Sequence, residues 1–293
     1  MGMFREDLAI HAREWTDYVT KTFPNEIAYS IASARAYSNG ADYADDIQRD
    51  NNNHLGFAVI DVNSPKYDYK FKSVISENRF TVHNSKLILV NTDSVSAVFD
   101  FYNLSHKITV LNFASFTHPG GKFYEGSRAQ EEALCHESTL YPVLRAHPEY
   151  YEHNKEYKNN FMYADILLYT KDIIFIKDRI VKADVITCAA PNMNANSKYS
   201  RIKVNSDSLY FTLLSRAMFI IKTALNNEAD TMILGAWGCG VFMCPPDLVC
   251  QAFIEAIKCV RGAKDMNFIF AVPRDKKNYP VFREIFESYG GKR

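Results

Sequence analysis

From Lys86 onward, short apolar runs alternate with longer segments in which apolar residues recur three or four positions apart. The short runs predict strands at residues 87–90, 108–113, 173–176, 185–188, 232–234 and 268–272. The periodic segments predict helices at residues 94–102, 129–144, 209–225, 246–260 and 279–289. Strands that alternate with helices in this way are typical of an α/β sheet that is covered on both faces.

The N-terminal part of the chain has a different pattern. Its apolar residues follow helical spacing at Leu8, Ala12, Trp15 and Val19, which predicts a helix over 4–21, and a second helix is expected over 27–37. Residues 38–53 are polar and predict an exposed loop, and 55–82 alternate only weakly. We interpret residues 1–82 as a mainly helical extension packed on a main domain at 83–293.

Composition excludes several classes of function. The 293 residues are 47% hydrophobic and 23% charged, as in an ordinary globular protein. Lys plus Arg and Asp plus Glu both total 34, which argues against a broad surface for nucleic acid or an acidic membrane. It does not exclude a polyanionic substrate held at one end by backbone amides. Because no apolar run reaches the length of a membrane span or a signal peptide, we expect a cytoplasmic protein with no membrane partner. We also expect a monomer.

The cysteines and histidines show no metal-binding spacing. None of the six cysteines forms a CxxC pair, and several lie in apolar runs, so we expect reduced thiols. No two histidines lie at HxxxH spacing within a helical pattern. The sequence therefore predicts no metal and no cofactor.

A long loop with a glycine pair connects the strand at 108–113 to the next helix. Gly120 and Gly121 can adopt positive φ, and without a Cβ they let a ligand approach the backbone. The helix opens with Gln130, Glu131 and Glu132. Adjacent helical residues project about 100° apart, so one carboxylate would hold a sugar hydroxyl while the other moves a proton. The structural alternative is that both only complement the helix dipole.

A second glycine-rich loop, GAWGCGVF at 235–242, also lies between an apolar run and a helix. Its successive N–H groups could cradle a diphosphate, although such a segment is also an ordinary turn. Cys239 has no apparent histidine partner, so we interpret it as a small loop residue, and Trp237 fits the core and the ligand side equally well. Because the chain has neither GxGxxG nor a P-loop, a dinucleotide fingerprint is not supported. Two such loops at strand ends can face each other across one cleft.

These two segments resemble a known family. NFASFTHPGGKFYEGSRAQEEALCHESTLY, at 112–141, resembles the signature of bacterial-type poly(ADP-ribose) glycohydrolases, a branch of the macrodomain fold. GAWGCGVF resembles the second, phosphate-binding loop of that family. The resemblance extends over about 87–272, and more weakly to the N-terminal helical segment. It implies a three-layer α/β/α macrodomain with a mixed central sheet, and a metal-independent enzyme that cleaves the ribose–ribose O-glycosidic bond from the chain end.

The resemblance also implies roles for individual residues. Glu132 would be the general acid/base, and Glu131 would hold ribose hydroxyls. The substrate-binding positions are Asn112, Gly120, Gly121, Gln130, Gly238, Cys239, Gly240, Val241 and Phe242. Among them, Phe242 would pack on the terminal ribose. The implied partners are poly(ADP-ribose) or ADP-ribose, and macromolecules that carry them.

Lys122 departs from the family pattern, which has a third glycine at this position. A lysine needs an ordinary φ here, and its side chain must leave the cleft; it could add positive charge near the diphosphate or crowd the substrate. Two alternatives to the polymer hydrolase remain open: an ADP-ribose-binding module without turnover, and a hydrolase of mono-ADP-ribosyl linkages. The intact Gln-Glu-Glu favours an enzyme, whereas Lys122 favours the binding module.

Overall fold

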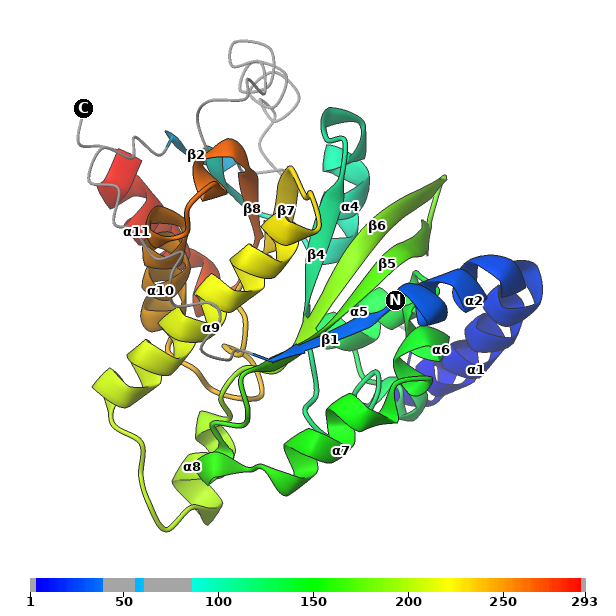
Figure 1. Cartoon of the computed structure of the whole chain (residues 1–293), viewed down its shortest axis with the longest axis horizontal. Coiled ribbons are helices and arrows are strands. Elements are labelled where there is room, and N and C mark those ends of the chain that lie inside the picture. Colours follow the sequence, from blue (N-terminus) through cyan, green and yellow to red (C-terminus); the bar gives the residue numbers. More distant parts are fainter. Residues whose placement is uncertain (1–3, 39–55, 61–85, 291–293) are drawn as a thin grey trace.

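The computed structural model describes residues 4–38, 56–60 and 86–290 (Figure 1). Eight strands within these ranges form one sheet in the order β1-β5-β6-β4-β7-β8-β3-β2. The strands are β1 Arg35–Ser38, β2 Gly56–Ile60, β3 Lys86–Val90, β4 Ile108–Phe113, β5 Ile166–Ile176, β6 Ile180–Cys188, β7 Thr231–Leu234 and β8 Asn267–Ala271. The six strands from β6 to β2 run parallel to one another, whereas β5 is antiparallel to both β6 and β1. The sheet is therefore mixed, as expected.

Helices cover both faces of this sheet (Figure 1). They are α1 Arg5–Thr22, α2 Pro24–Ser33, α4 Ser94–Phe101, α5 Gln130–His136, α6 Leu140–Arg145, α7 Pro148–Glu156, α8 Met193–Tyr199, α9 Ser206–Asn226, α10 Pro246–Cys259 and α11 Asn278–Gly290. Short 3₁₀ turns lie at η2 Tyr102–Leu104, η3 Phe123–Glu125, η4 Asn159–Phe161 and η5 Ala263–Asp265. Residues of α9, α10 and α11 belong to one apolar core cluster, and residues of α1, α2 and α4 to α7 belong to another. The result is the three-layer α/β/α arrangement that the sequence predicted.

Alternation along the strands explains the two cores. Successive side chains of a strand point to opposite faces. In β3, Leu87 and Leu89 join the α9–α11 cluster, while Ile88 and Val90 join the other cluster. α9 is long and apolar enough to resemble a membrane span by composition, but it contributes buried residues from Leu209 to Ala224 to the first core. Its hydrophobicity is thus used in packing against the sheet and α10.

One predicted helix proved to be two. We expected a continuous helix over 129–144, but α5 ends at His136 and α6 begins at Leu140. The residues between them pair with the edge of β5: the Ile176 amide donates to the Glu137 carbonyl, and the Thr139 amide donates to the Ile174 carbonyl, both at 2.9 Å. β1 covers only residues 166–169 of β5. The backbone groups of β5 beyond residue 169 need other hydrogen-bond partners. The residues between α5 and α6 provide them at Ile174 and Ile176.

The second predicted helix was too long, and two helices were missed. The helix expected over 27–37 ends at Ser33, because Arg35–Ser38 pair with β5 as β1. The short helices α7 and α8 were not predicted. The other predicted strands and helices are confirmed within a few residues, although β5 and β6 begin earlier than expected.

The N-terminal segment supplies both edges of the sheet in addition to its two helices. β1 lies at one edge, and β2, which pairs in parallel with β3, lies at the other (Figure 1). The predicted boundary between residues 82 and 83 lies outside the described residues and stays a prediction. So does most of the loop expected over 38–53.

Candidate active site

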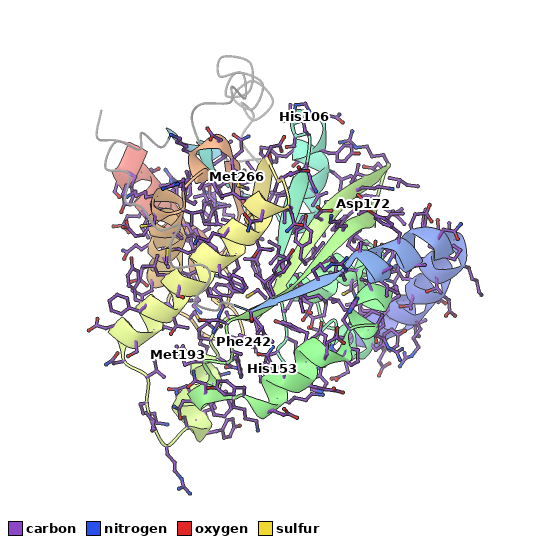
Figure 2. All side chains as sticks on the ribbon, viewed as in Figure 1. His106, His153, Asp172, Met193, Phe242 and Met266 are labelled. Carbon is purple, nitrogen blue, oxygen red and sulfur yellow. The ribbon has the colours of Figure 1, made fainter. Side chains whose placement is uncertain are left out.

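The carboxyl ends of the parallel strands open into a cleft of about 630 Å³. The segments after β4 and β7 line it, together with Ala190 after β6 and Val272 after β8. Figure 2 shows Phe242 of the second loop near Met193 of α8, whereas His106 and Met266, which precede β4 and β8, lie at the opposite end of the sheet. Open α/β sheets bind ligands at the carboxyl ends of their strands, and the volume suits a small-molecule ligand.

The glycine pair folds tightly beneath the cleft. Gly120 and Gly121 have φ of +67° and +58°. A Cβ on Gly120 would lie 2.6 Å from Cδ2 of Tyr141, and one on Gly121 would lie 2.5 Å from Oε1 of Glu132. Both positions therefore need glycine, for backbone conformation and for space.

Glu131 is buried and held by two N–H donors. Its side chain is 3% exposed. The amide of Ser115 donates to its Oε2 at 2.6 Å, and Nδ2 of Asn112 donates to its Oε1 at 3.3 Å. Burial raises the pKa of Glu131 to about 8, against the lowering effect of the Ser115 amide and with a smaller raising effect from Glu132. Glu131 is thus a fixed group that keeps its proton to an unusually high pH.

Glu132 is also buried, but one of its oxygens is left without a protein partner. The Lys122 amide donates to Oε1 at 2.8 Å. Oε2 has no hydrogen-bond partner among the described residues, although the side chain is only 5% exposed. A buried polar atom of this kind is rare in native proteins and indicates a missing partner. Because Glu132 lines the cleft, a ligand there is in position to provide it.

Gln130 connects helix α5 to the sheet. Its Oε1 accepts from the Phe113 amide at 2.8 Å, and its Nε2 donates to the Leu111 carbonyl at 2.9 Å. Nε2 also donates to Oγ of Ser94 at 3.1 Å. These bonds fix the start of α5 against the end of β4. Gln130 lines the cleft, but both of its polar groups are already engaged by the protein.

The second loop offers exposed amides on a rigid base. Gly238 has a φ of +74°, and a Cβ there would lie 2.6 Å from Cβ of Ala190. Cys239 is fully buried, and its amide donates to the Ala236 carbonyl at 3.1 Å. Within the described part of the chain, the amides of Gly240 and Val241 have no protein acceptor. A Cβ on Gly240 would meet nothing within 4 Å, so this backbone is open to a ligand.

An aromatic wall, formed by Phe116, Tyr163 and Phe242, lies beside the second loop. The rings of Phe116 and Tyr163 stack with centroids 3.7 Å apart, and Phe242 lies edge-on to Phe116 at 6.1 Å. The wall is braced by α8, because the Asn194 amide donates to the Phe242 carbonyl at 3.0 Å. Sequence reasoning found Phe242 but missed Phe116 and Tyr163, whose proximity depends on the tertiary fold.

Arg216 of α9 holds the Tyr163 segment in place. It is fully buried, and it pairs with Asp165 through an Nη2–Oδ1 distance of 2.7 Å. It also donates to the carbonyls of Ala189 and Met162, each at 2.9 Å. Tyr163 itself has a φ of +61°, which is uncommon for a non-glycine residue. These bonds stabilise the strained backbone that carries Tyr163 of the wall.

The model of the family described as "Microbial-type PARG, catalytic domain" matches residues 12–178 of the chain. The chain belongs to this family of poly(ADP-ribose) glycohydrolases. No curated protein matches it in sequence.

Solved bacterial glycohydrolases share the fold. The Thermomonospora curvata poly(ADP-ribose) glycohydrolase bound to the inhibitor ADP-HPD is 20% identical, with a TM-score of 0.73 over 96% of this chain and 99% of that chain. The Deinococcus radiodurans poly(ADP-ribose) glycohydrolase in complex with ADP-ribose is 24% identical, with a TM-score of 0.68 over 91% of this chain and 98% of that chain. At these identities the likeness shows a common architecture.

In this glycohydrolase, most of the predicted site residues lie together at the cleft. Gly121, Gln130, Glu131, Glu132, Gly238, Gly240, Val241 and Phe242 line it. Gly120 does not line the cleft but packs against the ring of Tyr141. Asn112 and Cys239 are fully buried, so they support Glu131 and the second loop from behind. Direct contact of these two side chains with a ligand stays a prediction.

Lys122 follows the expectation for a lysine in the glycine run. Its φ is −105°, an ordinary value, and its Nζ lies 3.4 Å from Oε2 of Glu125. The side chain is 65% exposed and lies at the lip of the cleft. The Lys122 backbone contacts Glu132 while the side chain extends to the surface.

Trp237 and His136 both make buried contacts near the site. Trp237 is 1% exposed and its Nε1 donates to the Cys188 carbonyl at 3.0 Å, but it also lines the cleft, so the core and ligand-facing interpretations both stand. His136 is buried at the end of α5, with its Nδ1 3.0 Å from Nδ1 of His11 in α1. Burial lowers the pKa of His136 to about 4, with a further lowering from His11. In the described ranges, no three His, Cys, Asp or Glu side chains are placed to hold a metal ion.

Proposed function

We propose that this chain hydrolyses the ribose–ribose O-glycosidic bond of poly(ADP-ribose) from the chain end, releasing ADP-ribose, with Glu132 as general acid/base. The observation that carries the assignment is the buried Oε2 of Glu132, which has no partner among the described residues and belongs to a residue that lines the cleft. Its neighbour Glu131 has both oxygens occupied by N–H donors. Of the two carboxylates, Glu132 is therefore the one able to exchange a proton with a substrate.

The proposed reaction cycles one proton through Glu132. Oε2 first donates its proton to the ribose oxygen of the leaving unit as the C1″–O bond breaks. The terminal ribose then carries positive charge at C1″, as in other glycoside hydrolyses. The Glu132 carboxylate next accepts a proton from water, whose oxygen bonds to C1″ and gives free ADP-ribose. The Lys122 amide keeps Oε1 in place throughout.

The other groups orient the terminal unit. Glu131 accepts one N–H group at each oxygen, and a carboxyl group has about four acceptor positions in all, so it can also hold ribose hydroxyls. The open amides of Gly240 and Val241 suit diphosphate oxygens. Phe242 gives the ribose an apolar surface beside them. The solved Deinococcus radiodurans relative in complex with ADP-ribose supports ADP-ribose as the ligand of this cleft.

One paired assay tests this function against its two alternatives. The purified chain is incubated with poly(ADP-ribose) and, separately, with a mono-ADP-ribosylated protein, and the products are separated by chromatography. We expect ADP-ribose from the polymer and none from the mono-modified protein. Binding of ADP-ribose with no product from either substrate would indicate a binding module, and release from the mono-modified protein alone would indicate the other hydrolase.

A further inference from the structure

The lip of the cleft beside Glu132 carries a cluster of charged side chains, formed by Lys122, Glu125 and Arg5. Lys122 Nζ and Arg5 Nη2 both approach Oε2 of Glu125, at 3.4 and 3.5 Å. The three side chains are 65%, 64% and 60% exposed for Lys122, Arg5 and Glu125. Two cations therefore share one carboxylate, and within this cluster the charge is net positive.

The backbone fixes this cluster relative to the acid/base. The Lys122 amide is hydrogen-bonded to Glu132 Oε1, so the lysine is attached at the edge of the catalytic carboxylate. The turn that follows is held by bonds from the Glu125 and Ser127 amides to the Lys122 carbonyl, at 3.0 and 3.2 Å. Nε of Arg5 donates to the Glu125 carbonyl at 2.8 Å. Arg5 of helix α1 therefore holds the turn at Glu125, on the solvent side of the lip. The Lys122 amide holds Glu132 on the side of the cleft.

Substrate chemistry places a phosphate near this lip. The oxygen protonated by Glu132 belongs to the adenosine ribose of the leaving unit, and the diphosphate of that unit is attached to the 5′ carbon of the same ribose. The negative charge is therefore one ribose away from Glu132. A lysine side chain is a flexible four-carbon stem with a point charge at its end, and it can extend over a comparable distance. Its exposed ion pair with Glu125 is weak enough to be exchanged for a phosphate.

We propose that Lys122, supported by Arg5, binds the diphosphate of the leaving ADP-ribose unit and so recognises polymer in preference to single ADP-ribose. This inference rests on the proposed function, because it requires polymer hydrolysis at Glu132. It assigns the lysine a substrate contact outside the pocket of the terminal unit. The ADP-ribose product lacks the leaving unit and makes no such contact.

The test compares Lys122→Met, Lys122→Arg and Glu125→Gln with a distant control, Lys182→Met. Lys182 is exposed near the amino end of β6, away from the carboxyl-end cleft. For Lys122→Met we expect the KM for polymer to rise about twofold to fivefold with little change in kcat, as for loss of one exposed charge contact. The slope of log KM against log salt should fall by about 0.7, the value for one phosphate contact on a single strand.

The remaining variants check the direction of the effect. Lys122→Arg should retain the wild-type KM, and Glu125→Gln should lower it by freeing the lysine. ADP-ribose affinity should be the same in Lys122→Met and the wild type. An unchanged KM and salt slope in Lys122→Met, or an equal change in Lys182→Met, would overturn this inference while the wild type still hydrolyses polymer. A wild type that leaves polymer intact would instead overturn the proposed function and this inference with it.

Discussion

A Cβ on Gly121 would lie 2.5 Å from Oε1 of Glu132 and 3.1 Å from Oε2 of Glu131. The bare glycine backbone therefore passes directly against both carboxylates. The next residue, Lys122, donates its amide to the same Oε1 at 2.8 Å. The loop and the carboxylate pair form one packed unit, in which the absence of a side chain at Gly121 determines where Glu132 can lie.

Gly121→Ala should disturb this unit. Alanine would have to adopt the positive φ of Gly121, which is unfavourable for a residue with a Cβ, and its Cβ would displace Glu132. We therefore expect a loss of about 1 kcal/mol or more in the free energy of unfolding. Turnover should fall at least about tenfold, because the carboxylate moves from its position. Denaturant unfolding and single-turnover release of ADP-ribose measure the two effects. Gly240→Ala is the control for folding: with nothing within 4 Å of its Cβ, its unfolding free energy should change by no more than about 0.5 kcal/mol.

Glu132→Gln should abolish most of the chemistry while keeping the binding site. Glutamine retains the shape and an acceptor for the Lys122 amide but cannot cycle a proton. We expect turnover to fall at least about 10²-fold, the lower end for general acid/base catalysis, with ADP-ribose affinity within about tenfold of wild type. Single-turnover release from polymer, with calorimetric ADP-ribose binding in parallel, measures both.

Glu131→Gln provides the matched comparison for the two roles. A residue that orients the ribose affects both binding and rate, so this variant should show a mixed effect. Near-normal turnover in Glu132→Gln together with loss of turnover in Glu131→Gln would exchange the two assignments. Near-normal rates in both would remove the carboxylate pair from the mechanism.

Glu131 should make the stability of the protein depend on pH. Its folded pKa is about 8, above the ordinary value of 4.5, so between these pH values the native state keeps a proton that the unfolded state has lost. The contribution is fully present below about pH 4.5 and is lost as the pH rises through 8. Relative to Glu131→Gln, which does not titrate, the wild type should lose up to about 1.4 kcal/mol of unfolding free energy per pH unit in this window. Parallel pH profiles for the two proteins would contradict the raised pKa.

Arg216→Met should destabilise the fold and loosen the aromatic wall. It removes a fully buried guanidinium that bonds Asp165 and the carbonyls of Ala189 and Met162. Breaking a buried pair by removing one partner costs about 3–5 kcal/mol. Arg283→Met is the control, since its ion pair with Glu287 is more than half exposed and should contribute less than about 1 kcal/mol. Equal unfolding midpoints for the two variants would show that the Arg216 bonds add little.

Local sequence patterns were sufficient for much of the fold and for the two adjacent carboxylates at the cleft. The apolar periodicity predicted nearly all central strands and the long helices, because burial on a sheet face or helix face imposes that spacing. The glycine pair, the second glycine-rich loop and Gln-Glu-Glu were found directly, since positive φ and exposed amides are local backbone properties. That the two carboxylates point in different directions also followed from helical geometry.

The tertiary structure decided what depends on contacts between distant segments. The break between α5 and α6 arises from hydrogen bonds to the uncovered edge of β5, and Arg35–Ser38 became a strand because the same edge was available. Phe116 and Tyr163 are separated by 46 residues in the sequence and meet only in the folded chain, where Arg216 bonds the backbone next to Tyr163. The sequence by itself specified the two carboxylates and the loops that carry bare amides. Which carboxylate is locked and which has a free oxygen was decided by Ser115, Asn112 and Lys122, since burial and hydrogen bonding exist only once these segments have packed together.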